Sequence, residues 1–192
     1  GDWSDQAGAI FRAIKLIETA PGLAQTPAIR WLPDHLFGHE HANRTILLYY
    51  TGITRLAKNI LAEIVRGIFL NSGPHLGILA DIGANADAAA AAVQKCDYAM
   101  LAEAVRTSWR LNQRLDLGTN PPEVQQILER VAEPLAAAKL LGAGGGGYLL
   151  LFAKDEPAAA RIRHLLTSDP PNPRARFVDF SLSETGLQVT RS

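Results

Sequence analysis

The sequence predicts an α+β fold in which helices cover one side of a largely antiparallel sheet. Apolar segments with the composition of strands open the chain, a helical block follows, and strand-like segments return from about residue 147. Grouped strands and grouped helices are typical of α+β proteins, whereas α/β proteins alternate the two kinds of element throughout. The length of 192 residues fits a single domain that spans the chain, 1–192.

Three strands are expected near the start. Residues 8–19 are rich in β-branched side chains, which favour a strand, and Pro21-Gly22 ends this segment. A second short run, 28–32, stops at Pro33. Residues 45–50 (Thr-Ile-Leu-Leu-Tyr-Tyr) form an apolar run of the kind found in a strand that is buried on both faces.

The middle of the chain has the helical period. Between residues 56 and 69 apolar pairs recur every four positions, with charged and polar side chains on the opposite side. Thr51 or Thr54 can cap this helix by accepting a hydrogen bond from a free backbone N–H. Two more helices are expected over 74–93 and 97–115. Pro121-Pro122 begins a fourth, short one, because proline suits the first helical turn.

The last third returns to strands. Residues 147–153 (Gly-Tyr-Leu-Leu-Leu-Phe-Ala) predict a buried strand, and 156–166 a helix with Pro157 in its first turn. Residues 174–182 alternate in the manner of a strand. Ser183-Glu-Thr-Gly186 is then expected to turn the chain into a final strand over 187–191, so that the chain ends in a β-hairpin.

Composition excludes several classes of protein. The chain is 47% hydrophobic with 19 basic and 19 acidic residues, which does not fit a disordered chain or the basic excess of nucleic-acid binders. Charged or polar residues interrupt every apolar run before the 18 or so residues of a membrane span. A single cysteine, Cys96, cannot form an internal disulfide, and no leader-like segment is visible, so we expect a cytoplasmic protein. Because the first residue is Gly1, we expect a piece of a longer chain.

A glycine-rich segment is the most informative motif. Five of the 16 glycines fall in the six residues 142–147, here called the glycine bend. Without Cβ atoms, such a bend can adopt positive φ angles and bring backbone N–H groups close to a phosphate or to another loop. A flexible connector between a helix and a strand is the alternative. Gly142, Gly144 and Gly147 have the spacing of a dinucleotide fingerprint, but that motif requires a strand before the glycines and a helix after them, and the order expected here is the reverse. A P-loop is also excluded, because no Gly-Lys-Ser/Thr closes the bend.

Several motifs together resemble one family. The run from Lys139 to Gly147 followed by Tyr-Leu-Leu-Leu resembles the third motif of GHMP-type small-molecule kinases. The segments Leu-Leu-Tyr-Tyr-Thr51-Gly52-Ile-Thr-Arg55, Gly-Thr-Asn120-Pro-Pro and Asn172-Pro-Arg-Ala-Arg-Phe-Val178 are similar to the kinase part of bifunctional L-fucokinase/L-fucose-1-phosphate guanylyltransferases. This similarity covers nearly the whole chain in the same order. It implies the ferredoxin-like C-terminal domain of a GHMP kinase.

The resemblance implies roles for particular residues. Asp5, in Gly1-Asp-Trp-Ser-Asp-Gln6, matches the family's base, which accepts the proton of the anomeric hydroxyl while the γ-phosphoryl group transfers. Asp2 departs from the family pattern, which has glycine there. Substrate contacts are implied for Trp3, Gln6, Thr51, Gly52, Arg55 and Asn120. Support of the phosphate loop is implied for Lys139, Gly142, Ala143, Gly144, Gly145, Gly146 and Gly147.

Each of these residues also has a structural explanation. Asp5 can be a solvated or capping aspartate near a terminus. Thr51, Gly52 and Arg55 lie where a strand ends and a helix begins, where free N–H groups and a guanidinium can meet an anion or sugar hydroxyls. The sequence alone slightly favours the alternative, a helix cap with an exposed arginine. Asn120 before two prolines can be a turn residue.

The family also requires parts that this sequence lacks. A GHMP kinase wraps ATP and positions Mg²⁺ mainly with an N-terminal domain, whose Gly- and Ser-rich loop does not occur here. We therefore expect the N-terminal kinase domain of the same chain and a small sugar as partners, with no nucleic acid or membrane, and an isolated fragment without activity. The alternatives are a heptose 7-phosphate 1-kinase of the same family, a non-catalytic binding or assembly module, and a nucleotide sensor.

Three weaker patterns favour structural explanations. Arg106, Arg110 and Arg114 lie at four-residue spacing near Glu103 and predict a solvated helix face. His35, His39 and His41 share one loop, but their spacing matches no zinc pattern, so no metal site is expected. Cys96 is expected to be inert or used in packing.

Overall fold

The computed structural model describes residues 7–8, 10–20, 22, 26–38, 40–54, 65–66, 70, 73–142 and 145–187. A hairpin of two strands, β1 (Ile14–Glu18) and β2 (Ala28–Leu32), forms one sheet. The second sheet contains β3 (Ile46–Tyr50), β4 (Leu135–Leu140), β5 (Tyr148–Ala153) and β6 (Arg176–Val178), in the order β4-β5-β3-β6. Every neighbouring pair is antiparallel, which confirms the predicted α+β class.

The described part of the chain contains four α-helices of nine or more residues: α3 (Gly73–Gln94), α4 (Tyr98–Leu115), α5 (Pro122–Arg130) and α6 (Glu156–Ser168). All four lie where the sequence predicted helices. Asp97 and Asp155 cap α4 and α6, since their side chains accept hydrogen bonds from the N–H groups of Met100 and Ala158. The helix expected over 56–69 lies mostly outside the described residues, and of that range residues 65–66 are helical.

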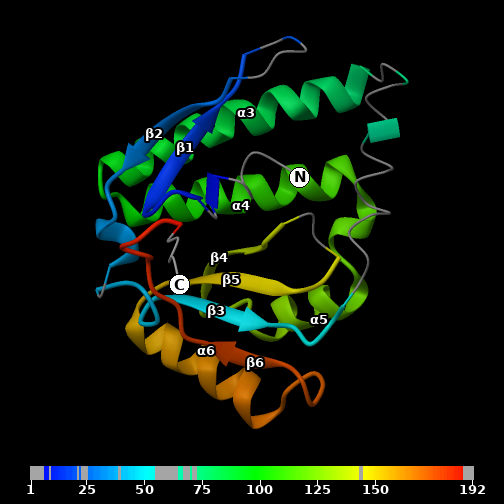
Figure 1. Ribbon diagram of the computed structural model, residues 1–192. Coiled ribbons are helices and arrows are strands. Elements are labelled where there is room, and N and C mark those ends of the chain that lie inside the picture. Colours follow the sequence, from blue (N-terminus) through cyan, green and yellow to red (C-terminus); the bar gives the residue numbers. More distant parts are fainter. Residues whose placement is uncertain are drawn as a thin grey trace, which may run out of the picture.

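Helices cover both faces of the four-stranded sheet, and not one face as expected (Figure 1). One face carries Leu47, Tyr49 and Leu151, which pack with side chains of α5 and α6 such as Ile127 and Ile162. The other face carries Ile46, Ala137 and Phe152, which pack with α3 and α4 through Val93 and Leu101. Buried side chains are thus shared between the sheet and the helices on each of its faces.

Strand β4 was not predicted. Its sequence, Leu-Ala-Ala-Ala-Lys-Leu, has no β-branched residue and has the composition of a helix. Pairing with β5 on one side and packing against α4 on the other override this preference. The glycine bend therefore joins two antiparallel strands, and the expected connection from a helix to a strand was wrong.

Two expected strands differ at the ends of the chain. Residues 10–13 do not extend β1, because Ala13 has a left-handed φ of 62° and the ammonium of Lys15 binds the carbonyl oxygens of Phe11 and Ala13 in this turn. After β6, the described residues 179–187 form no hairpin. They run beside residues 10–13, where Ala13 N–H donates to Ser183 O and Leu187 N–H donates to Ile10 O.

Within the described part of the chain, one helix, α3, is long and apolar enough to cross a membrane by length and composition. Asp81 and Asp87 interrupt the apolar sequence of this helix. The helix lies along α4 (Figure 1), and Ile78 and Val93 are buried. The expectation that no segment spans a membrane stays a prediction.

Candidate functional site

The end of strand β3 forms the first part of the site, here called the Thr51 corner (residues 51–53). Thr51 is fully buried. Its backbone N–H and its hydroxyl both donate to the carbonyl oxygen of Gly147, each at 2.9 Å. The same hydroxyl oxygen accepts a hydrogen bond of 3.2 Å from Ile53 N–H. The corner is thus tied to the glycine bend by backbone and side chain together.

The glycine bend lies against this corner. Gly142, Gly145, Gly146 and Gly147 all have positive φ angles, of 74°, 78°, 156° and 90°, which glycine adopts without strain. Gly147 N–H donates to Ile53 O at 3.0 Å. A Cβ atom on Gly146 would lie 2.7 Å from that same oxygen, so the close approach requires glycine. Ala143 and Gly144 lie outside the described residues.

The third part of the site is the turn before α5. Gly145 N–H donates to Thr119 O at 2.9 Å, and Thr119 is buried. The amide nitrogen of Asn120 donates to Gln113 Oε1 at 3.1 Å and to Gln125 Oε1 at 2.8 Å. Its amide oxygen is buried and has no hydrogen-bond partner among the described residues. The structure therefore brings three predicted segments, around Thr51, Asn120 and Gly145, to one end of the sheet.

A residue that the sequence analysis did not single out, Asn172, completes this arrangement. It lies in the connection between α6 and β6, and its amide nitrogen donates to Thr51 O at 2.8 Å. Gly52 has a φ of 72°, and a Cβ atom there would lie 2.0 Å from Asn172 Oδ1. The only signal in the sequence was that Asn172 begins one of the segments that resemble the family.

Lys139 points from β4 toward α4. Its ammonium donates to the Ser108 hydroxyl at 2.5 Å. Burial lowers the pKa of Lys139 below its usual value of 10.5, because a low-dielectric environment disfavours the charged form. Its proposed support of the phosphate loop stays a prediction.

The remaining candidates are placed as follows. Asp5, Trp3, Gln6 and Arg55 lie outside the described residues. His41 Nδ1 lies 3.0 Å from the Thr45 hydroxyl and its ring stacks on Tyr98. Within the described ranges no group of three or more His, Cys, Asp or Glu side chains is arranged to hold a metal ion. His39 is also undescribed.

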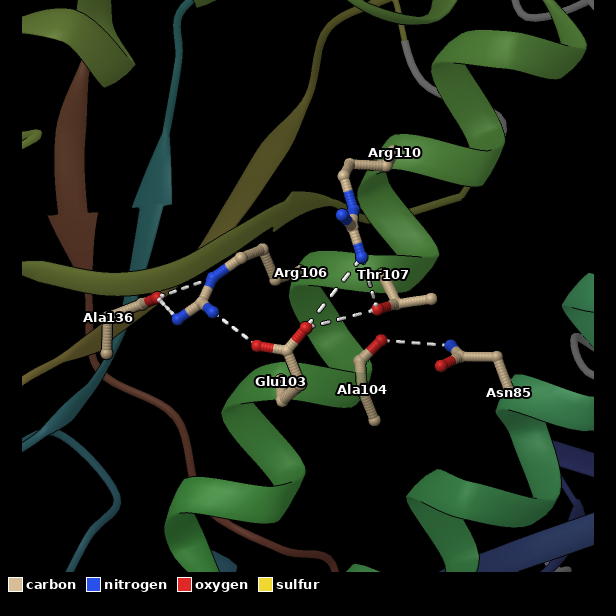
Figure 2. A network of polar contacts seen from close by, with 7 residues as sticks. All are labelled: Asn85, Glu103, Ala104, Arg106, Thr107, Arg110 and Ala136. Atoms are coloured by element: carbon tan, nitrogen blue, oxygen red, sulfur yellow. Dashed lines mark hydrogen bonds and ion pairs between the residues drawn. The ribbon is translucent and has the colours of Figure 1, made fainter.

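Figure 2 shows the arginine face of α4. Arg106 donates to the Ala136 carbonyl of β4 at 3.2 Å and 2.6 Å and pairs with Glu103. Arg110 contacts the same carboxylate at 3.8 Å and the Thr107 hydroxyl at 3.0 Å. These side chains are at least half exposed, as predicted for a solvated face. Arg106 also holds α4 to the edge of the sheet.

The chain is similar to several known proteins. The pattern of the family described as GHMP kinases C terminal matches residues 89–171. The L-fucokinase/L-fucose-1-P guanylyltransferase of Bacteroides fragilis is 50% identical over all 192 residues, which cover 20% of that protein. The bifunctional fucokinase/GDP-fucose pyrophosphorylase of Arabidopsis thaliana is 26% identical over 166 residues, 86% of this chain and 16% of that protein. The chain thus spans a fifth or less of the length of these relatives.

Among solved structures, a putative sugar kinase from Campylobacter jejuni superposes with a TM-score of 0.64 at 21% identity. The match covers 97% of this chain and 50% of that one. At this level of identity the likeness shows the fold alone. The fold resembles half of a larger kinase.

Proposed function

Because residues 89–171 match the C-terminal domain of GHMP kinases, we propose that the chain is the C-terminal part of an ATP-dependent sugar kinase of this family that converts L-fucose to L-fucose 1-phosphate. The observation that carries this proposal is the 50% identity over all 192 residues to the Bacteroides fragilis protein. The fold contributes the site at the end of the sheet, where the Thr51 corner, Asn120 and the glycine bend meet.

In this proposal Asp5 accepts the proton of the anomeric hydroxyl, which is a weak nucleophile until a carboxylate orients and deprotonates it. Trp3 and Gln6 flank the sugar. The sugar is contacted directly, or through the segments that they hold, by Thr51, Gly52, Arg55 and Asn120. The unpartnered amide oxygen of Asn120 supports this role, since a buried acceptor without a partner is costly unless a ligand or water satisfies it.

The glycine bend supports a phosphate site but does not form the main cradle. Its Gly145 and Gly147 N–H groups already donate to the carbonyl oxygens of Thr119 and Ile53, so these two donors are not available to a phosphate. ATP and Mg²⁺ would then be held mainly by an N-terminal domain of the same chain; the greater length of the Bacteroides fragilis relative, of which this chain covers 20%, supports this part of the proposal. When bound, they supply the transferred phosphoryl group and neutralise its charge. We also propose that the protein is cytoplasmic; the single cysteine of the sequence supports this.

The test uses the intact protein that contains this chain. Purified protein should form ADP and a sugar 1-phosphate with L-fucose, and ³¹P NMR identifies the anomeric phosphate. Turnover of galactose or heptose 7-phosphate without turnover of L-fucose would reject the substrate.

Asp5→Asn separates a kinase from a binding or assembly module. We expect turnover to fall by about 10²–10⁴-fold, the usual contribution of general-base catalysis, while calorimetry still detects L-fucose binding. Asp2→Asn is the matched control because it makes the same charge change three residues away, and it should retain turnover. Equal effects of the two substitutions would contradict the role of Asp5.

A further inference from the structure

The antiparallel pair of β3 and β6 has an asparagine clamp at each end. Asn172 precedes β6 and binds Thr51, which follows β3. Asn43 precedes β3 and binds Phe180, which follows β6. The two clamps join the same two strands, but only Asn172 lies at the end that carries the candidate site.

The Asn172 side chain is held in a single arrangement. Its Oδ1 atom accepts hydrogen bonds from Arg174 N–H at 3.0 Å and Ala175 N–H at 3.1 Å, which fix the turn into β6. Its Nδ2 atom then reaches Thr51 O at 2.8 Å. The absence of a side chain on Gly52 makes room for this amide, since a Cβ atom would overlap Oδ1 at 2.0 Å. Donor and acceptor are therefore both used, and the amide plane is fixed.

Asn172 completes the hydrogen bonding of Thr51. The N–H and hydroxyl of Thr51 are bound by Gly147 O, and its carbonyl oxygen is bound by Asn172. Asn172 thus fixes the orientation of the peptide that links Thr51 to Gly52. The direction in which the chain continues through Ile53 and Thr54 toward Arg55 depends on that peptide.

We propose that Asn172 is a positioning residue for the sugar kinase reaction, which holds the Thr51 corner so that the corner contacts the sugar. This inference rests on the proposed function. A misplacement of about 1 Å in a substrate-binding segment is enough to cost up to about 100-fold in rate or affinity, so a clamp without substrate contact can still control binding.

If Asn172 only stabilised the fold, a substitution in the other clamp should change the KM for L-fucose as much as one at Asn172. Asn43 therefore provides the matched control. Asn43 makes two hydrogen bonds to Phe180, of 2.7 Å to the carbonyl oxygen and 3.0 Å from the N–H. It also has a left-handed φ of 63°, so that Asn43→Ala adds backbone strain. Asn43→Ala is therefore expected to perturb the domain at least as much as Asn172→Ala.

The experiment compares the intact wild-type protein with Asn172→Ala, Asn172→Asp and Asn43→Ala. Asn172→Asp keeps the acceptor for Arg174 and Ala175 but loses the donor to Thr51. We expect both Asn172 variants to raise the KM for L-fucose about tenfold, because both lose the hydrogen bond to Thr51 O, with kcat and the KM for ATP within about twofold of wild type. Asn43→Ala should leave all three values within about twofold.

Hydrogen exchange by mass spectrometry gives a readout that does not depend on activity. In Asn172→Ala, amides of the Thr51 corner and of Gly145 and Gly147 should exchange about tenfold faster than in Asn43→Ala, because local opening controls exchange. In Asn43→Ala, the faster exchange should instead appear near Phe180 and Ala13.

The outcomes separate this inference from the proposed function. If wild type phosphorylates L-fucose and the Asn172 and Asn43 variants change its KM equally or not at all, the positioning role is overturned. If wild type phosphorylates no sugar, the proposed function fails, and exchange alone decides whether Asn172 holds the corner. Equal exchange at the corner in both alanine variants overturns the clamp in either case.

Discussion

Thr51 and Gly147 are joined by two hydrogen bonds that end on one oxygen atom, because the N–H and the hydroxyl of Thr51 both donate to the Gly147 carbonyl at 2.9 Å. Thr51→Val removes the hydroxyl at nearly constant volume and leaves the Ile53 N–H without its acceptor. We expect this substitution to lower the free energy of unfolding by about 1–3 kcal/mol. Thr51→Ser keeps the hydroxyl and should cost about 1 kcal/mol for the lost methyl group. Urea denaturation of the 192-residue chain measures both, and equal losses would contradict the role of the hydroxyl.

Gly52 and Gly142 form a natural pair for substitution. Both have left-handed φ angles, of 72° and 74°. A Cβ atom at Gly52 would overlap Asn172, whereas no described heavy atom beyond the chain neighbours lies within 4 Å of one at Gly142. Gly142→Ala should cost about 1–2 kcal/mol of backbone strain, and Gly52→Ala about 1–3 kcal/mol more from overpacking. The difference between their urea midpoints tests the contact with Asn172.

Lys139 predicts a pH dependence of stability. Burial depresses the pKa of Lys139 in the folded chain below 10.5, so between the folded and unfolded pKa values the unfolded chain binds more protons. The free energy of unfolding therefore increases as pH rises from the folded pKa toward 10.5. It decreases again as pH falls through the same window. The free energy of unfolding of wild type minus that of Lys139→Met should increase across that window when both are measured from neutral pH upward. Lys154→Met, at an exposed site, controls for net charge. A difference that stays flat with pH would contradict the prediction.

Cys96 is exposed and does not pack in the core, so of the two expectations only the inert role remains. It has a left-handed φ of 54° at the turn from α3 to α4, where Asp97 N–H donates to Ala92 O at 3.0 Å. Glycine is the preferred residue at this position of a helix C-terminus. Cys96→Gly should raise the free energy of unfolding by up to about 1 kcal/mol, and Cys96→Ala should not. Thermal unfolding under reducing conditions compares the two, and a stabilising alanine would refute the explanation.

The isolated 192-residue chain should bind no ATP. The N–H groups of Gly145 and Gly147 are used within the domain, and the nucleotide is proposed to bind mainly to an N-terminal domain. Calorimetry with ATP and Mg²⁺ should detect no heat, and L-fucose should give no ADP. The intact protein is the positive control. Binding by the isolated chain would support the nucleotide-sensor alternative.

Much of the fold was predictable because local signals agreed with the final packing. The apolar runs of β3 and β5 and the periodicity of α4 all predicted the right elements. Strand β4 was not predictable in this way, since its alanines favour a helix until β5 and α4 surround it. The turn at Ala13 was also missed, because no sequence signal marks a left-handed alanine.

The candidate site was predictable in its parts but not in its assembly. The glycine bend and the Thr51 corner stood out as motifs, but their contact depends on the β3–β5 register that places Tyr50 opposite Tyr148. Asn172 contacts a residue 121 positions earlier, so only the folded chain shows the pair. Asp5, Trp3, Gln6 and Arg55 stay predictions from the resemblance.

The packing of residues 183–187 beside residues 10–13 links the tail of the domain to the segment that follows the Asp5 motif. A peptide tag inserted directly after Leu187 would therefore be attached close to residues 10–13. Protein used for kinetics should therefore carry any tag elsewhere. Otherwise tagged and cleaved enzyme should be compared before a change in turnover is assigned to a substitution.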